Sequence, residues 1–239
     1  MTDDKPIRPY SIKVNPRAKR VILKVSCHQG LEVVVPKGFN RGCIPEILRE
    51  KREWIERAFN KLGEHGDIER PALSLPQFIH LRSVDERLAV RYAYAPTGMV
   101  RLDERDDRCI DVTGETGNMD ACCGVLRDWL KLCGKRHILP WLHRVSDETR
   151  LYFKSAQIRG QRSRWGSCST KGTISLNYKL LFLPPELVRY LLIHELCHTL
   201  HMNHSPAFWR VVESIEPDCR ALDAEINTAR QYVPAWAEI

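Results

Sequence analysis

The chain has 239 residues, of which 43% are hydrophobic and 28% charged, the composition of a globular protein with a sizeable core. It contains no run of about 18 apolar residues, so we expect no transmembrane helix and no membrane partner. The first residues, Met1–Pro6, are polar and acidic rather than apolar like a signal peptide, and this favours a cytoplasmic protein.

Charge and cysteine content narrow the class further. The formal net charge of +7 permits contact with nucleotides or nucleic acid but does not require it. The 9 cysteines are odd in number and contain no C-x-x-C pair, so we expect neither a disulfide framework nor a cysteine zinc ribbon. In a reducing compartment most cysteines are small buried residues, and we expect packing roles for Cys168 and Cys197.

The first half of the chain is rich in short strands. Alternating apolar residues predict strands at 10–14, 21–25 and 31–35, with His28-Gln29-Gly30 as the turn of a hairpin or meander. An apolar stripe among charged residues then predicts one amphipathic helix over 43–62.

Residues 73–113 return to the strand pattern. They include a turn at Pro96-Thr97-Gly98 and a charged loop from Asp103 to Arg108. Asn118 is expected to cap a helix that runs to about Val145 and is interrupted at Pro140.

The second half begins as a predicted hairpin. Its arms are Leu151–Arg159 and Thr173–Phe182, and the segment 160–169 between them is rich in turn residues. The strand at 173–177 could be an edge strand, to which an extended peptide could add, or an ordinary core strand. Helices are predicted at 206–215 and at about 218–230.

Between the hairpin and these helices lies the run His194-Glu195-Leu196-Cys197-His198. Two imidazoles four residues apart lie on one face of a helix and can bind one metal ion, and the adjacent glutamate can deprotonate a water. The segment from Leu187 to Leu200 is apolar almost all the way round, which is typical of a buried helix. Buried His and Glu side chains need partners, and a metal ion would supply one.

A catalytic zinc site needs a third protein ligand. His201 would continue the helix face, but three nitrogens strung along one rigid helix do not converge easily, so we favour His204. Asn203 can take the left-handed conformation that reverses a chain, and Ser205-Pro206 is typical of a helix start. A glutamate of the next helix, Glu213 or Glu216, is the rival ligand.

The motif and its surroundings resemble the YgjP-like metallopeptidase domain family. The similarity is dense from about Ile158 to Trp209 and looser toward the N-terminus. It includes the following segments: Arg162-Ser163-Arg164-Trp165-Gly166-Ser167-Cys168, Gly172-Thr173-Ile174-Ser175-Leu176-Asn177, Leu183-Pro184-Pro185, the His194–His198 run, Asn203-His204-Ser205-Pro206-Ala207-Phe208-Trp209, Asn15-Pro16-Arg17-Ala18-Lys19-Arg20 and Val33-Val34-Val35-Pro36-Lys37-Gly38.

This resemblance implies Zn2+ bound by His194, His198 and His204, with Glu195 catalytic, and kinship with SprT-like and other zincin proteases. We therefore expect an α+β fold with a zincin-like core, in which the metal-binding helix packs on a small antiparallel sheet. A soft boundary near residue 115 would separate a β-rich half with one amphipathic helix (1–115) from the metal-binding half (116–239), within one continuous domain.

Three functions remain open from the sequence. The preferred one is a zinc peptidase that cleaves a peptide or protein substrate. The second is a nucleoside triphosphate pyrophosphatase, because Arg159, Arg162 and Arg164 could hold phosphates or nucleic acid, although a solvated basic loop explains them equally well. The third is a non-catalytic zinc module that binds nucleic acid, for which Glu195 has no use.

Overall fold

The computed structural model describes residues 8–26, 30–61, 74–96 and 98–238. The chain divides into two compact units, Met1–Leu73 and Ser74–Ile239. The boundary expected near residue 115 falls inside the second unit, between β7 and α3, whose bounds are given below. The division into halves within one continuous domain stays a prediction.

The first unit contains a three-stranded sheet of order β1-β3-β2. Its strands are β1 (Tyr10–Val14), β2 (Ile22–Ser26) and β3 (Gly30–Val35). β3 is central, antiparallel to β2 and parallel to β1, so a meander is wrong and β2 with β3 forms the hairpin. The turn predicted at 28–30 falls largely outside the described residues, which resume at Gly30.

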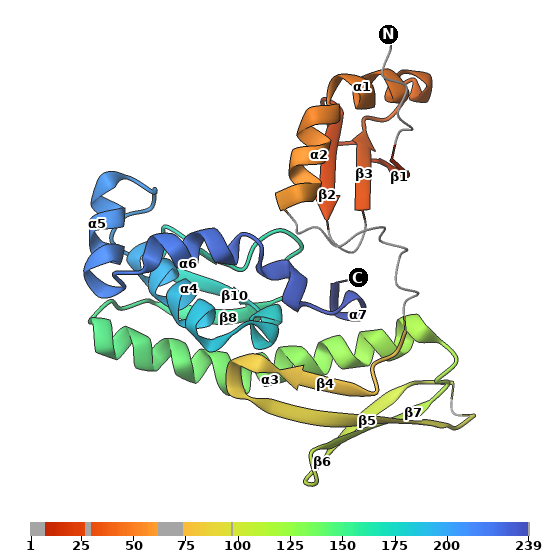
Figure 1. Cartoon of the computed structure of the whole chain (residues 1–239). Coiled ribbons are helices and arrows are strands. Elements are labelled where there is room, and N and C mark those ends of the chain that lie inside the picture. The colour runs from red at the N-terminus through yellow and green to blue at the C-terminus, as the bar shows by residue number, and fades with distance from the viewer. Residues whose placement is uncertain (1–7, 27–29, 62–73, 97, 239) are drawn as a thin grey trace. The chain divides into compact units, whose positions relative to one another are not determined.

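Two helices cover one face of this sheet (Figure 1). They follow a short 3-10 helix, η1 (Arg41–Cys43), and are α1 (Ile44–Glu50) and α2 (Arg52–Lys61). The single helix predicted over 43–62 is wrong, because the backbone leaves the helical region at Lys51, which caps α1. The buried core joins strand and helix residues, namely Leu31, Val33, Val35, Ile44, Leu48 and Ile55.

The second unit opens with a four-stranded sheet of order β4-β5-β7-β6. Its elements are β4 (Phe78–Leu81), η2 (Arg82–Val84), β5 (Glu86–Tyr94), β6 (Arg101–Arg105) and β7 (Cys109–Gly114). The predicted short strands are therefore present. The charged loop predicted from Asp103 is shorter, because β6 continues to Arg105. The turn predicted at 96–98 includes residue 97, outside the described residues.

The long helix α3 (Met119–Thr149) connects the two sheets of this unit (Figure 1). As predicted, Asn118 caps it, and its side chain accepts a hydrogen bond from the Ala121 amide at 3.0 Å. The predicted interruption at Pro140 is wrong, because the helix runs through this residue. Ile138 and Leu142 are fully buried on either side, and their packing offsets the missing backbone bond.

The second sheet has the order β8-β10-β9. Its strands are β8 (Ser155–Arg159), β9 (Gly166–Cys168) and β10 (Thr173–Asn177). β10 is parallel to β8 and antiparallel to β9, so the predicted hairpin is wrong and the sheet is mixed rather than antiparallel. Because β10 is central, residues 173–177 are not an edge strand. After β10 the chain forms η3 (Tyr178–Phe182) in place of the predicted strand.

Helices complete the second unit. They are α4 (Pro185–Cys197), α5 (Pro206–Ile215), α6 (Cys219–Ile226), η4 (Ala229–Tyr232) and α7 (Ala235–Glu238). α4 is the buried helix that the sequence predicted, and it contacts α3, α5, α6 and β9. The helix predicted at 218–230 ends earlier, at Ile226. The fold is α+β, and among the described helices none combines the length and apolarity needed to cross a bilayer.

Candidate metal centre

The helix α4 brings His194, Glu195 and His198 into the interior of the second unit. Pro184 and Pro185 start the helix where no backbone donor is required. The apolar residues around its circumference bury it, and this burial extends to the polar motif, with Glu195 4% and His198 8% exposed. His198 caps the helix, so the motif occupies its last turn.

The segment after α4 brings His204 back toward the helix. Ser205 caps α5 as predicted, and its side chain accepts a hydrogen bond from the Phe208 amide at 3.3 Å. The left-handed turn predicted at Asn203 is wrong, because the non-glycine residues with positive φ in the described chain are Asp85, Arg108 and Arg150. The extended backbone of Ser205 (φ −67°, ψ 167°) contributes to the change of direction instead.

The three histidines converge on one point. One ring nitrogen of each of His194, His198 and His204 lies within 4.8 Å of those of the other two. The Nε2 atoms of His194 and His204 are 3.0 Å apart. Two nitrogens bound to one tetrahedral zinc ion are separated by roughly 3.3 Å, so this cluster has the dimensions of such a site.

In His194 and His198, the other ring nitrogen, Nδ1, forms a hydrogen bond within the protein. His194 Nδ1 is 3.3 Å from the Tyr190 hydroxyl, which donates to Asp223 Oδ1 at 2.8 Å. His198 Nδ1 is 2.9 Å from the backbone oxygen of His201. Both arrangements place the ring proton on Nδ1 and leave Nε2 free to bind a metal.

Burial and the neighbouring imidazoles favour the uncharged form of His194 and His198. Burial, followed by the proximity of His198 and His204, lowers the pKa of His194 to about 3. Burial also lowers the pKa of His198, against an opposing backbone hydrogen bond. A metal ligand must be a neutral imidazole, so the donor set matches what a divalent cation requires.

Phe208 forms one wall of the cluster. It is fully buried, and its ring centroid lies 5.0 Å from that of His194, 4.6 Å from that of His198 and 4.9 Å from that of His204. Trp209 lies slightly further out, with the Arg220 guanidinium 3.8 Å from its ring centroid. Phe208, four residues after His204, thus packs against all three imidazole rings.

Glu195 is a buried carboxylic acid whose Oε2 has no hydrogen-bond partner in the described part of the chain. Burial raises the pKa of Glu195 to about 8, and the positive charge of Arg164 opposes this rise. An unpaired buried acid is costly for a fold, so its retention beside three converging imidazoles points to chemistry at this place.

Gly166, at the start of β9, packs directly against the Glu195 side chain. A Cβ atom at residue 166 would lie 2.8 Å from Cγ and Cδ of Glu195, closer than real Cβ contacts come. The absence of a side chain at this position therefore allows the carboxylate to lie beside the strand.

The chain matches the model of the YgjP-like metallopeptidase domain over residues 19–229. It belongs to the YgjP-like family. It is therefore a metallopeptidase-type hydrolase, as the resemblance of its motifs indicated.

Two solved structures are similar to part of the YgjP-like chain. The metallopeptidase zymogen of Pyrococcus abyssi abylysin is 32% identical, with a TM-score of 0.35, and the match covers 38% of this chain and 91% of that one. The zymogen of Methanocaldococcus jannaschii jannalysin is 20% identical, with a TM-score of 0.32, covering 36% and 89%. No curated protein matches.

The other candidate ligands lie outside the cluster. His201 contributes its backbone oxygen to His198, and its side chain does not belong to the group of converging donors. Glu213 forms an ion pair with Arg220 at 2.9 Å. The described side chains that could bind one ion together do not include Glu216, Cys168 or Cys197.

The arginines named from the sequence lie on and just after β8. Arg159, Arg162 and Arg164 are all exposed. The buried Asn177 side chain shapes the loop that follows β8, because it donates to the backbone oxygens of Gln161 and Arg164 at 2.8 Å each. The positive charge of Arg164 lowers the pKa of Glu195 and so opposes the effect of burial. The backbone oxygen of Arg162 accepts a hydrogen bond from the Arg230 guanidinium.

Three functional neighbours escaped the sequence analysis, namely Tyr190, Asp223 and Gly166. Tyr190 lies four residues before His194 on the same helix face, and this spacing could have identified it. Asp223 comes from α6, and no local pattern connects it with α4. Gly166 lies in a segment that carries the family resemblance, but no sequence pattern places it beside Glu195.

Proposed function

We propose that this chain is a zinc-dependent peptidase in which His194, His198 and His204 hold the metal and Glu195 is the general base. The observation that carries the proposal is the convergence of three imidazoles, within 4.8 Å, beside a buried carboxyl group. When bound, zinc would polarise the scissile carbonyl and lower the pKa of a water molecule.

The chain's own residues would handle the proton. Glu195 takes a proton from the attacking water and passes it to the amine of the leaving group. Burial raises the pKa of Glu195 in the metal-free protein, and a cation bound beside it would favour the ionised form that accepts a proton from water. Arg164, whose positive charge lowers the pKa of Glu195, is exposed and lies two residues before β9.

The substrate would bind as an added strand. β10 has partners on both sides, so the free edge of this sheet nearest α4 belongs to β9 (Gly166–Cys168). A peptide paired with β9 would run past Gly166 and therefore past the Glu195 carboxylate that packs against it. This position replaces the strand at 173–177 that the sequence offered.

The alternatives have less support. A non-catalytic zinc module has no use for a buried unpaired acid next to its ligands. A pyrophosphatase would need cations around the phosphates, and Arg159, Arg162 and Arg164 remain the candidates for that role. Release of pyrophosphate from nucleoside triphosphates, measured on the same preparations as peptidase activity, separates this reaction from peptide hydrolysis.

The first test replaces Glu195 with Gln, which keeps the size of the side chain and removes its basicity. We expect hydrolysis of fluorescein-labelled casein to fall roughly 10²- to 10⁴-fold, while the zinc content of the purified protein is unchanged. Glu213→Gln, which changes an exposed glutamate outside the cluster, is the matched control and should keep its activity.

Metal analysis tests the ligands separately from the reaction. His204→Ala should lose zinc, and Glu213→Ala should retain it. A Glu195→Gln protein that cleaves casein at the parental rate would falsify the general-base role, and a His204→Ala protein with full zinc would remove His204 from the site.

A further inference from the structure

The positive charge of the chain is concentrated in its first unit. From Arg8 to Lys61 the sequence has thirteen Lys and Arg residues against five Glu, an excess of eight, whereas the whole chain has a formal charge of +7. The rest of the chain is therefore close to neutral. The metal centre lies in the second unit, so this charge needs an explanation other than the peptidase chemistry.

Within the first unit, most of the excess positive charge lies on the strands and their loops rather than on the helices. On α1 and α2 the basic residues alternate with four glutamates, as on an ordinary solvated face. From Pro9 to Cys43, seven basic residues are accompanied by a single acid, Glu32. Glu32 is occupied by Lys13 and Lys24, whose Nζ atoms lie 3.8 and 4.0 Å from its oxygens.

The remaining five cations gather at one end of the sheet, which we call the basic end: Arg17, Lys19, Arg20, Lys37 and Arg41. The pairing Val14↔Val35 brings the ends of β1 and β3 together, and Ile22↔Val34 places the start of β2 beside them. Four of the five residues lie in the loops 15–21 and 36–40, which leave the sheet there, and Arg41 follows the second loop as the first residue of η1. The backbone amide of Asn15 donates to the Val35 oxygen at 2.9 Å and holds the start of the first loop beside the end of β3.

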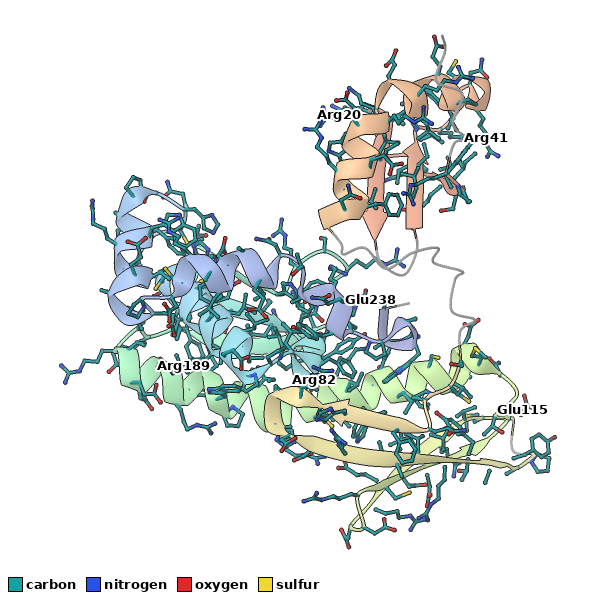
Figure 2. All side chains as sticks on the ribbon, in the orientation of Figure 1. Arg20, Arg41, Arg82, Glu115, Arg189 and Glu238 are labelled. Carbon is teal, nitrogen blue, oxygen red and sulfur yellow. The ribbon has the colours of Figure 1, made fainter. Side chains whose placement is uncertain are left out.

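These five side chains are exposed and free of ion pairs with other described residues. Figure 2 shows Arg20 and Arg41 on opposite flanks of the same end of the unit. Three strands span roughly 10 Å, so the charges are spread across a face rather than focused on one point. A single small anion cannot use such a distribution, whereas a polyanion with regularly spaced charges can.

We propose that the basic end binds nucleic acid through its phosphate backbone. A strand of nucleic acid carries one phosphate per roughly 3.4 Å of axis, so a face of this width meets several phosphates at once. Guanidinium groups form bidentate bonds with phosphate oxygens, and three of the five residues are arginines. Phe39, the aromatic residue of the loop 36–40, packs against the buried core of the unit rather than standing free to stack on a base, so we expect the binding to be independent of sequence.

The test uses the full-length protein and fluorescence anisotropy with labelled 20-mers of mixed sequence, as single-stranded DNA, duplex DNA and RNA. Affinity should fall as salt rises from 50 to 200 mM. Arg17→Gln/Lys19→Gln/Arg20→Gln should weaken binding at least about tenfold at 50 mM salt and make the dependence on salt distinctly shallower, because each phosphate contact contributes about 0.7 to 0.9 to the logarithmic slope.

The matched control is Arg49→Gln/Lys51→Gln/Arg57→Gln, which removes two arginines and one lysine from the exposed helix side of the same unit. It changes the net charge equally and should weaken binding less than threefold. Circular dichroism establishes that both triple variants are folded. The comparison of the three oligonucleotides distinguishes DNA from RNA as the preferred source of phosphates.

Equal losses in the two triple variants would overturn the proposal, because net charge alone would then explain the binding. Equal affinity for polyglutamate, or for vesicles containing phosphatidylserine, would also overturn it in favour of an acidic protein or a membrane. Casein hydrolysis should be unaffected by the first triple variant, so failure here leaves the peptidase proposal untouched.

Discussion

At the scale of single residues, the candidate site depends on a glycine that takes no part in the chemistry. Gly166 leaves the space that the Glu195 carboxylate fills, and its strand is the one to which a substrate would add. In the proposed mechanism, the same residue would set both the position of the base and its closeness to the substrate.

Replacing Gly166 with Ala should displace Glu195 without removing a ligand. We expect kcat/KM on casein to fall roughly 100-fold, the cost of a displacement of about 1 Å in a catalytic group, with zinc content unchanged. Gly124→Ala is the control, because no atom lies within 4 Å of a Cβ at that position in α3. Activity within twofold of the parent would show that Glu195 tolerates the added methyl group.

The hydrogen bonds behind His194 should determine metal affinity. Tyr190→Phe and Asp223→Asn interrupt the connection from Asp223 through Tyr190 to His194, and we expect each to weaken zinc binding roughly 10- to 100-fold. Competition with a chromophoric chelator measures this directly. Tyr178→Phe, which loses a buried hydrogen bond to Ala237 far along the chain, should leave zinc affinity unchanged.

The sequence predicted the residues whose relation is local. His194, Glu195 and His198 lie within one helix turn, and the helix break before Ser205 returns His204 toward them. These local relations were sufficient to predict that the four residues lie together. Asp223 could not be predicted in the same way, because its position depends on how α6 packs against α4. Contacts between distant segments have no local signature in a single sequence.

At the scale of elements, one cluster of hydrogen bonds joins the first sheet of the second unit to α3. Glu104 on β6 accepts two bonds from the Arg136 guanidinium, at 2.9 and 2.8 Å, and one from Trp129 Nε1 at 3.0 Å. The hydrogen bonds from Arg136 are the main cause of a lowered pKa at Glu104, with Trp129 adding to the effect against partial burial.

Glu104→Gln should therefore alter the dependence of stability on pH. At pH 7 the parent should be more stable by about 1 kcal/mol, a value discounted for solvent screening of this half-exposed pair. Because the folded pKa lies below the ordinary 4.5, this advantage is present above pH 4.5 and disappears as the pH falls through the lowered value.

Urea unfolding at pH 7, 5, 4 and 3 measures the difference between the two proteins. Glu115→Gln, an exposed substitution outside the cluster, is the control and should follow the parent at every pH. A difference that grew toward low pH would contradict the assignment, because the ionised carboxylate would then not be the stabilising form.

The sequence predicted strands and helices correctly where the spacing of apolar residues is regular. For β8, β9 and β10 it did not predict which strands pair with each other or in which direction. The two arms of the predicted hairpin do contain strands, but β8 pairs with β10 in parallel, and the antiparallel partner of β10 is β9. A strand of three residues is too short to show a period. Likewise, Pro140 argued for a break that the packing of α3 overrides.

At the scale of the whole molecule, the division of the chain follows contacts rather than composition. The sequence suggested a boundary where strands give way to helices, near residue 115, whereas the compact units meet at Leu73 and Ser74. Composition could not show this, because β4 to β7 belong to the same unit as the helices that follow them. The metal centre and the basic end are consequently on different units.

Zinc should stabilise only the unit that carries the three histidines. At a free zinc concentration about 1,000 times the dissociation constant, binding adds about 4 kcal/mol, which corresponds to roughly 10 °C for a unit of this size. Calorimetry of the metal-free protein, with and without added zinc, should show this shift in the transition of the second unit. His204→Ala should abolish it, and an equal shift in that variant would mean that zinc binds elsewhere.

The connector between α4 and α5 has one further property. Leu200 and Met202 are 57% and 47% exposed, so this segment gains little from hydrophobic burial. An ion shared by His194 and His204 would close a ring across these residues and act as a reversible cross-link. This connector would thus take its shape from cation occupancy rather than from packing, and a chelator would loosen it as well as remove the metal.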